Sequence, residues 1–62
     1  MSNAAELSSL TTALEDMTKR VTAMADAYAS QRREDLANEL YAVERQMRNA
    51  VRRLGKVVDS GA

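Results

Sequence analysis

The sequence predicts a small all-α protein, in which two helices form an antiparallel hairpin and two hairpins dimerise into a four-helix bundle. Three observations favour this fold class. Proline is absent and both glycines lie near the C-terminal end, so nothing interrupts a helix before residue 55. Apolar residues recur at helical spacing in both halves of the chain. The phase of that repeat shifts once, close to residue 30.

The first helix is expected from about residue 4 to residue 29. Its seam of apolar residues advances in unbroken steps of three and four, the heptad spacing of helices that pack lengthwise: Leu7, Leu10, Leu14, Met17, Val21, Met24 and Tyr28. Asn3-Ala4-Ala5-Glu6 matches a capping box, which favours this early start. A competing start at Thr12 would leave Leu7 and Leu10 outside the repeat.

The second helix is expected from about residue 33 to residue 58. Its seam has the same spacing: Leu36, Leu40, Val43, Met47, Ala50, Leu54 and Val57. Glu34 and Asp35 would occupy the first turn, where carboxylates interact favourably with the helix dipole. Residues 59–62 are expected to form a loose tail, so that residues 1–62 make one helical-hairpin domain.

The two seams are out of phase by one residue. A strict heptad continued from Tyr28 would place the next seam residue at Asp35, whereas the second seam begins at Leu36. The polar stretch between them predicts a turn at residues 30–33. The alternative is one long helix in a parallel or antiparallel coiled coil, which would tolerate the shift as a skip residue. The lack of Gly and Pro at the break supports this alternative.

A two-helix hairpin covers only one side of each seam. A chain of 62 residues also buries little apolar surface by itself. Small residues beside the seam widen the apolar surface from the two positions per heptad of a coiled coil toward the three used in bundles: Ala13, Ala25, Ala27, Ala37 and Val51. We therefore expect a homodimer whose stability depends on concentration.

The composition excludes much of enzyme chemistry. Cysteine and histidine are both absent, which removes zinc–thiolate sites, nucleophilic triads and the commonest general base. No glycine-rich phosphate loop is present. We expect no enzymatic activity and no catalytic, cofactor-binding or metal site. The sequence shows no targeting segment and no apolar run that would cross a membrane, so a cytoplasmic location is expected.

Charge is balanced in total but not along the chain. Residues 1–31 have a net charge of −2 and residues 32–62 a net charge of +2, with +4 between Glu44 and Lys56. A candidate surface for a polyanion or an acidic partner follows from the basic residues of this segment: Arg45, Arg48, Arg52, Arg53 and Lys56. The competing interpretation is a solvated helix face whose cations favour the C-terminal dipole.

The functional hypothesis is a non-enzymatic protein-interaction module, a small homodimeric adaptor or regulator. Its expected partners are a second copy of itself and an amphipathic helix of another protein, because the seam residues Met17, Met24 and Met47 repack easily. The alternative is a small nucleic-acid-binding regulator that uses the basic residues of the second helix. Nucleic acid is not favoured as the partner, because Tyr41 is the only aromatic residue among those cations.

In length and layout the chain resembles the Rop-like regulators, short hairpins that dimerise into four-helix bundles and bind RNA. The resemblance concerns size and organisation, and it carries over no site residue. It assigns no family to this chain.

Overall fold

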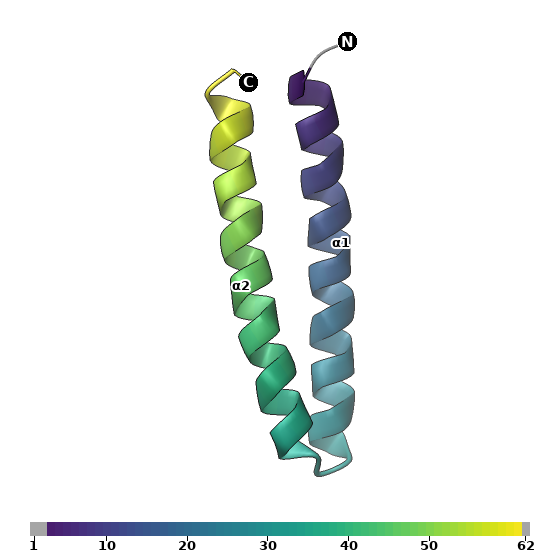
Figure 1. Ribbon diagram of the computed structural model, residues 1–62. Coiled ribbons are helices and arrows are strands. Elements are labelled where there is room, and N and C mark those ends of the chain that lie inside the picture. The colour runs from purple at the N-terminus through teal and green to yellow at the C-terminus, as the bar shows by residue number, and fades with distance from the viewer. Residues whose placement is uncertain (1–2, 62) are drawn as a thin grey trace.

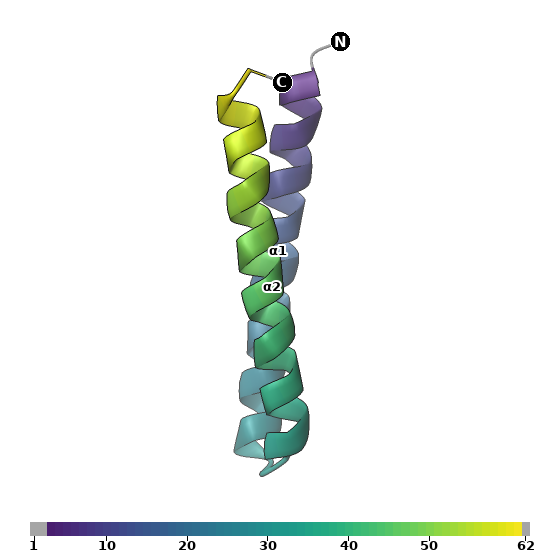
Figure 2. The same ribbon diagram turned by 60° about the vertical axis from the view of Figure 1, so that its left-hand side comes forward.

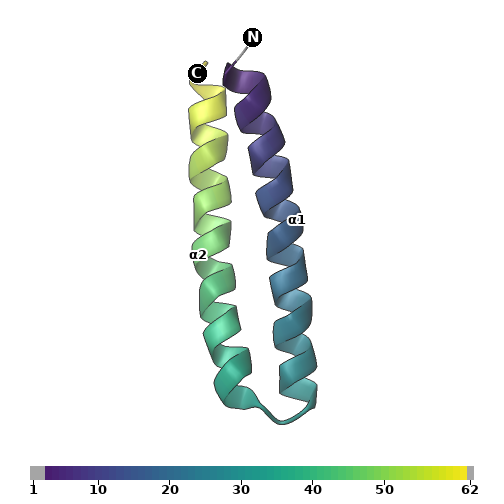
Figure 3. The same ribbon diagram turned by 45° about the vertical axis from the view of Figure 1, so that its right-hand side comes forward.

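The computed structural model describes residues 3–61, which form two α-helices joined by a short turn (Figure 1). Helix α1 spans Asn3–Ser30 and helix α2 spans Glu34–Asp59. The helices run antiparallel in a single layer, as the two rotated views in Figures 2 and 3 also show. The Cα atoms extend over 47 × 15 × 10 Å. The predicted all-α hairpin is confirmed, and one continuous helix is not formed.

The helix ends differ slightly from those expected. Asn3 is already helical in α1, so the helix includes Leu7 and Leu10, and the competing start at Thr12 is wrong. Asp59 belongs to α2, so Ser60 and Gly61 are the described residues that follow it, and Ala62 lies outside the described residues. Neither helix of the described residues is long and apolar enough to cross a membrane.

The turn at residues 31–33 closes α1 with a Schellman arrangement. The backbone N–H of Arg33 donates to the carbonyl of Tyr28 at 2.9 Å, and the N–H of Arg32 donates to the carbonyl of Ala29 at 3.1 Å. This pattern needs a left-handed residue after the helix, and Arg32 has φ 61° there. Glycine is the usual residue at such a position, because a Cβ atom is strained in the left-handed region.

The contact between the helices is made by small side chains. Ala25 of α1 and Ala37 of α2 are 0% and 1% exposed, and Thr18 is 4% exposed. The turn has only three residues, so the two helices are close together next to it. Alanine permits this close approach because its side chain is a single methyl group. Thr18 tolerates burial because its hydroxyl donates to the carbonyl of Leu14 at 2.7 Å.

Replacement of Arg32 by glycine is predicted to stabilise the protein. Arg32→Gly removes the strained Cβ but gives the unfolded chain more freedom, for a net gain of about 0.5–1 kcal/mol in the free energy of unfolding. Urea denaturation at fixed protein concentration measures this gain. Gln31→Gly is the matched control, because Gln31 does not have a positive φ and should lose stability instead. An unchanged or lower stability of Arg32→Gly would contradict the prediction.

Candidate functional site

Each helix has two unlike faces on either side of the contact. A helical residue is rotated by about 100° from its neighbour in sequence. Thr18 is buried against α2, so Met17 before it and Lys19 after it point to opposite sides of the hairpin. On α2 the same holds for Ala50 and Arg52, which flank the half-buried Val51. Because the helices are antiparallel, the residue just before each contact residue in the sequence points to the same side of the hairpin in both helices.

That side carries what we call the apolar stripe, which consists of Leu10, Met17 and Met24 of α1 with Leu36, Val43, Ala50 and Val57 of α2. Its large side chains are exposed to an unusual extent: Leu10 53%, Met17 46%, Met24 55%, Val43 41% and Val57 42%. These five are the exposed large hydrophobic residues of the described chain. Exposed large apolar side chains on one side of a small protein mark a candidate interaction surface.

The structure divides the predicted seam into two rows. Half of its residues form the apolar stripe. The other half lie at the boundary between the stripe and the helix–helix contact and are half-buried: Leu7, Leu14, Val21, Tyr28, Leu40, Met47 and Leu54. The hairpin therefore covers the half-buried row in part and leaves the apolar stripe exposed.

The opposite side of the hairpin is polar and links the helices by hydrogen bonds. Thr22 of α1 donates its hydroxyl to Oε2 of Glu44 at 2.9 Å. Arg48 donates from its guanidinium to the same Oε2 at 2.7 Å, in an ion pair along α2. Further toward the turn, the hydroxyl of Tyr41 donates to Oδ1 of Asp26, and this bond raises the pKa of Tyr41. These contacts tie α1 to α2 at two successive levels.

Sequence reasoning named Ala25 and Ala37 only as small residues beside the seam, and it missed Thr11, Thr18 and Glu44 of the contact between the helices. Thr11, Thr18 and Ala25 form a heptad row of small residues on α1, and Glu44 lies in the corresponding row of α2. The signal was present as the seven-residue spacing of Thr11, Thr18 and Ala25. It was overlooked because the larger Leu10, Met17 and Met24 have the same spacing one position earlier.

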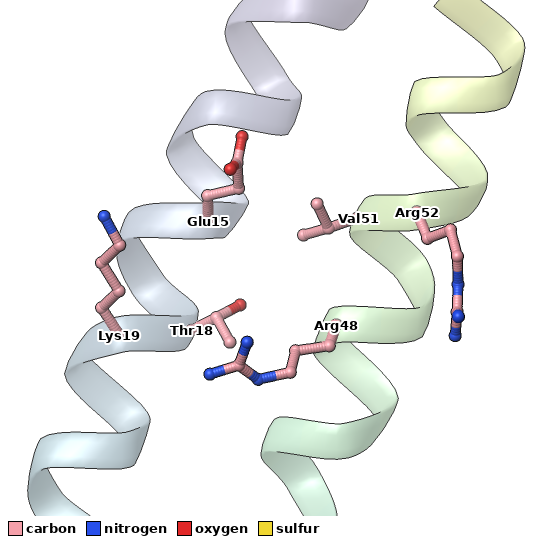
Figure 4. Close-up of a pocket in the computed structure, with 6 residues that line it drawn as sticks. All are labelled: Glu15, Thr18, Lys19, Arg48, Val51 and Arg52. Carbon is pink, nitrogen blue, oxygen red and sulfur yellow. The ribbon is translucent and has the colours of Figure 1, made fainter.

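A hollow of about 240 Å³ lies between the helices on the polar side. Figure 4 shows the residues that line it, which are Glu15, Thr18 and Lys19 of α1 with Arg48, Val51 and Arg52 of α2. Three of the six are cations and one is a carboxylate. Arg48 reaches across toward Thr18 in this view. The hollow is smaller than the roughly 300–1,000 Å³ of sites for drug-sized ligands.

The predicted basic residues do not form a single surface. Arg48 and Arg52 line the hollow together with Lys19, which the sequence analysis did not include. Arg45 is exposed at the same helical position as Arg52, one heptad earlier, and Lys56 is exposed nearby. Arg53 is rotated by about 100° from Arg52 and therefore points away from the hollow.

The described residues hold no cluster of three or more side chains suited to a metal ion. Comparisons with family models, with curated proteins and with solved structures found no match to this chain.

Acid is predicted to weaken the hairpin through Glu44. Hydrogen bonds from Arg48 and Thr22 lower the pKa of this carboxyl group from its ordinary 4.5. The ionised form therefore stabilises the fold at higher pH, and this contribution is lost as the pH falls through the lowered pKa. Urea denaturation at a series of pH values measures the effect. Glu44→Gln should lose more of the acid dependence than Glu39→Gln, which removes an exposed carboxyl group of the same helix. Equal profiles for the two variants would contradict the prediction.

Proposed function

We propose that this protein is a non-enzymatic helical interaction module that forms a homodimer through its apolar stripe. The observation that carries the proposal is the exposure of five large apolar side chains, 41–55% each, on one side of the hairpin. The proposal does not depend on an enclosed catalytic site. The absence of cysteine fits a reducing compartment, so we place the module in the cytoplasm.

A second copy of the chain fits the stripe for three reasons. Among residues 3–61 of one hairpin, the buried residues are Thr18, Ala25 and Ala37, which is little core for an independent fold. Both helices contribute to the stripe, so two copies can pack face to face over its full length as a four-helix bundle. The formal net charge of zero adds no overall repulsion between copies.

A dimer of this kind has the properties of an adaptor or a regulator. Folding and association are coupled, so the amount of folded module depends on its concentration. The methionines of the stripe also repack easily, and an amphipathic helix of another protein is therefore the natural competitor for the same surface.

A charge in the apolar stripe is predicted to abolish the dimer. Met17→Glu places an unpaired carboxylate in the interface of both copies, which should weaken dimerisation by at least about 100-fold because each buried charge costs several kcal/mol. Sedimentation and circular dichroism over a dilution series measure association and helicity together. Thr12→Glu is the matched control, because it adds the same charge on the exposed polar side of α1. A wild-type protein that stays monomeric and fully helical at every concentration would contradict the proposal.

A second candidate function is the binding of a polyanion, such as a nucleic acid, on the polar side. The observation that favours it is the hollow, where Lys19 of α1 joins Arg48 and Arg52 of α2. Arg48 already pairs with Glu44, whereas Lys19 and Arg52 form no ion pair among residues 3–61. Phosphate groups are the common ligands of such a set of cations.

Removal of the two unpaired cations should reduce RNA binding. In Lys19→Gln/Arg52→Gln, the affinity for a short RNA is expected to fall, and the slope of log affinity against log salt concentration should decrease by about 2. Fluorescence anisotropy at several salt concentrations measures both. The control Arg20→Gln/Arg53→Gln removes the same charge from residues outside the hollow and should keep the wild-type slope. Equal losses in both variants would reject the hollow as the binding site.

A further inference from the structure

We infer that the two hairpins of the dimer pack with their turns at the same end. This inference rests on the dimer proposed above and specifies its geometry. It comes from the sizes of the side chains that face each other across the apolar stripe.

The hydrogen bonds between the helices define which residues are level. Thr22 contacts Glu44 and Asp26 contacts Tyr41, so residues whose numbers add to about 66 or 67 lie side by side. Three levels of the apolar stripe follow from this relation: Leu10 beside Val57, Met17 beside Ala50, and Met24 beside Val43. At every level, α1 provides the longer side chain and α2 the smaller one.

Two symmetric arrangements bring the stripes of two copies face to face. If the twofold axis is parallel to the helices, α1 lies over α2 of the partner at the same level, and both turns are at one end. If the axis is perpendicular to the helices, α1 lies over α1 of the partner and the turns are at opposite ends. Neighbouring helices are antiparallel in both arrangements, so the helix dipoles do not select between them.

Side-chain volume does select between them. With the turns at the same end, Met17 lies over the partner's Ala50, and Leu10 and Met24 lie over valines of the partner. With the turns at opposite ends, Met17 meets the partner's Met17 while Ala50 meets the partner's Ala50. At this central level, the second arrangement therefore crowds two methionines together on one side of the interface and leaves a gap between two alanines on the other side. Close packing needs large side chains opposite small ones, which the first arrangement provides at all three levels.

Distances between spin labels test this arrangement directly. The chain has no cysteine, so Gln31→Cys places one nitroxide label in the exposed turn of each copy. Pulsed electron–electron resonance should give a turn-to-turn distance well below half of the 47 Å hairpin length. Asp16→Cys, at an exposed position near the middle of α1, is the control, because its two labels lie at nearly the same level along the bundle in either arrangement and stay well short of 47 Å apart.

The outcomes separate this inference from the dimer itself. A turn-to-turn distance below half of 47 Å at Gln31→Cys, with a defined distance well short of 47 Å at Asp16→Cys, supports the same-end arrangement. A defined distance well short of 47 Å at Asp16→Cys with one approaching 47 Å at Gln31→Cys overturns the inference and leaves the dimer intact. A sample that sediments as a monomer and shows no defined distance at either position overturns both.

Discussion

The structure depends on a close contact between helices through small side chains. Thr18 and Ala25 of α1 and Ala37 of α2 are the buried residues, and none of them is a large apolar side chain. Since neighbouring residues of a helix diverge by about 100°, this choice of contact forces Met17 and Met24 outward. A contact through the methionines would have turned Thr18 and Ala25 outward instead. The exposed apolar stripe is therefore a direct consequence of how the hairpin closes.

The polar side fixes the register of the two helices. Glu44 has a side chain only 14% exposed, and its carboxylate has partners in Thr22 and Arg48. A slide of α1 by one heptad would place Glu15 or Ala29 where Thr22 now lies, and neither side chain can donate a hydrogen bond to the carboxylate. A poorly solvated carboxylate without its donor is costly, so the network selects one register. This selection matters because Leu and Met packing alone discriminates weakly between registers.

The sequence predicted the hairpin because the phase of the heptad repeat breaks where the chain turns, between Tyr28 and Leu36. It did not reveal which row of residues closes the hairpin. The row that begins at Leu10 and the row that begins at Thr11 have the same seven-residue spacing. Hydrophobicity alone favours the Leu10 row as the contact, whereas the Thr11 row makes it. Half-burial of Thr11 and burial of Thr18 become acceptable because their hydroxyl groups donate to carbonyls of the preceding turn, which a pattern of residue types does not display. Lys19 was missed for a related reason, because its place beside Arg48 depends on the register between helices.

The separation of the two faces limits what the proposed dimer would bind. The hollow lies on the side of the hairpin opposite the apolar stripe, so packing of the stripes leaves it open. Two hairpins joined stripe to stripe then carry their hollows on opposite outer faces of the bundle. A short rigid ligand reaches one hollow at a time and gains no avidity from the second. Two separate ligands, by contrast, would bind on either side of the proposed bundle, which is the geometry expected of the adaptor that we propose.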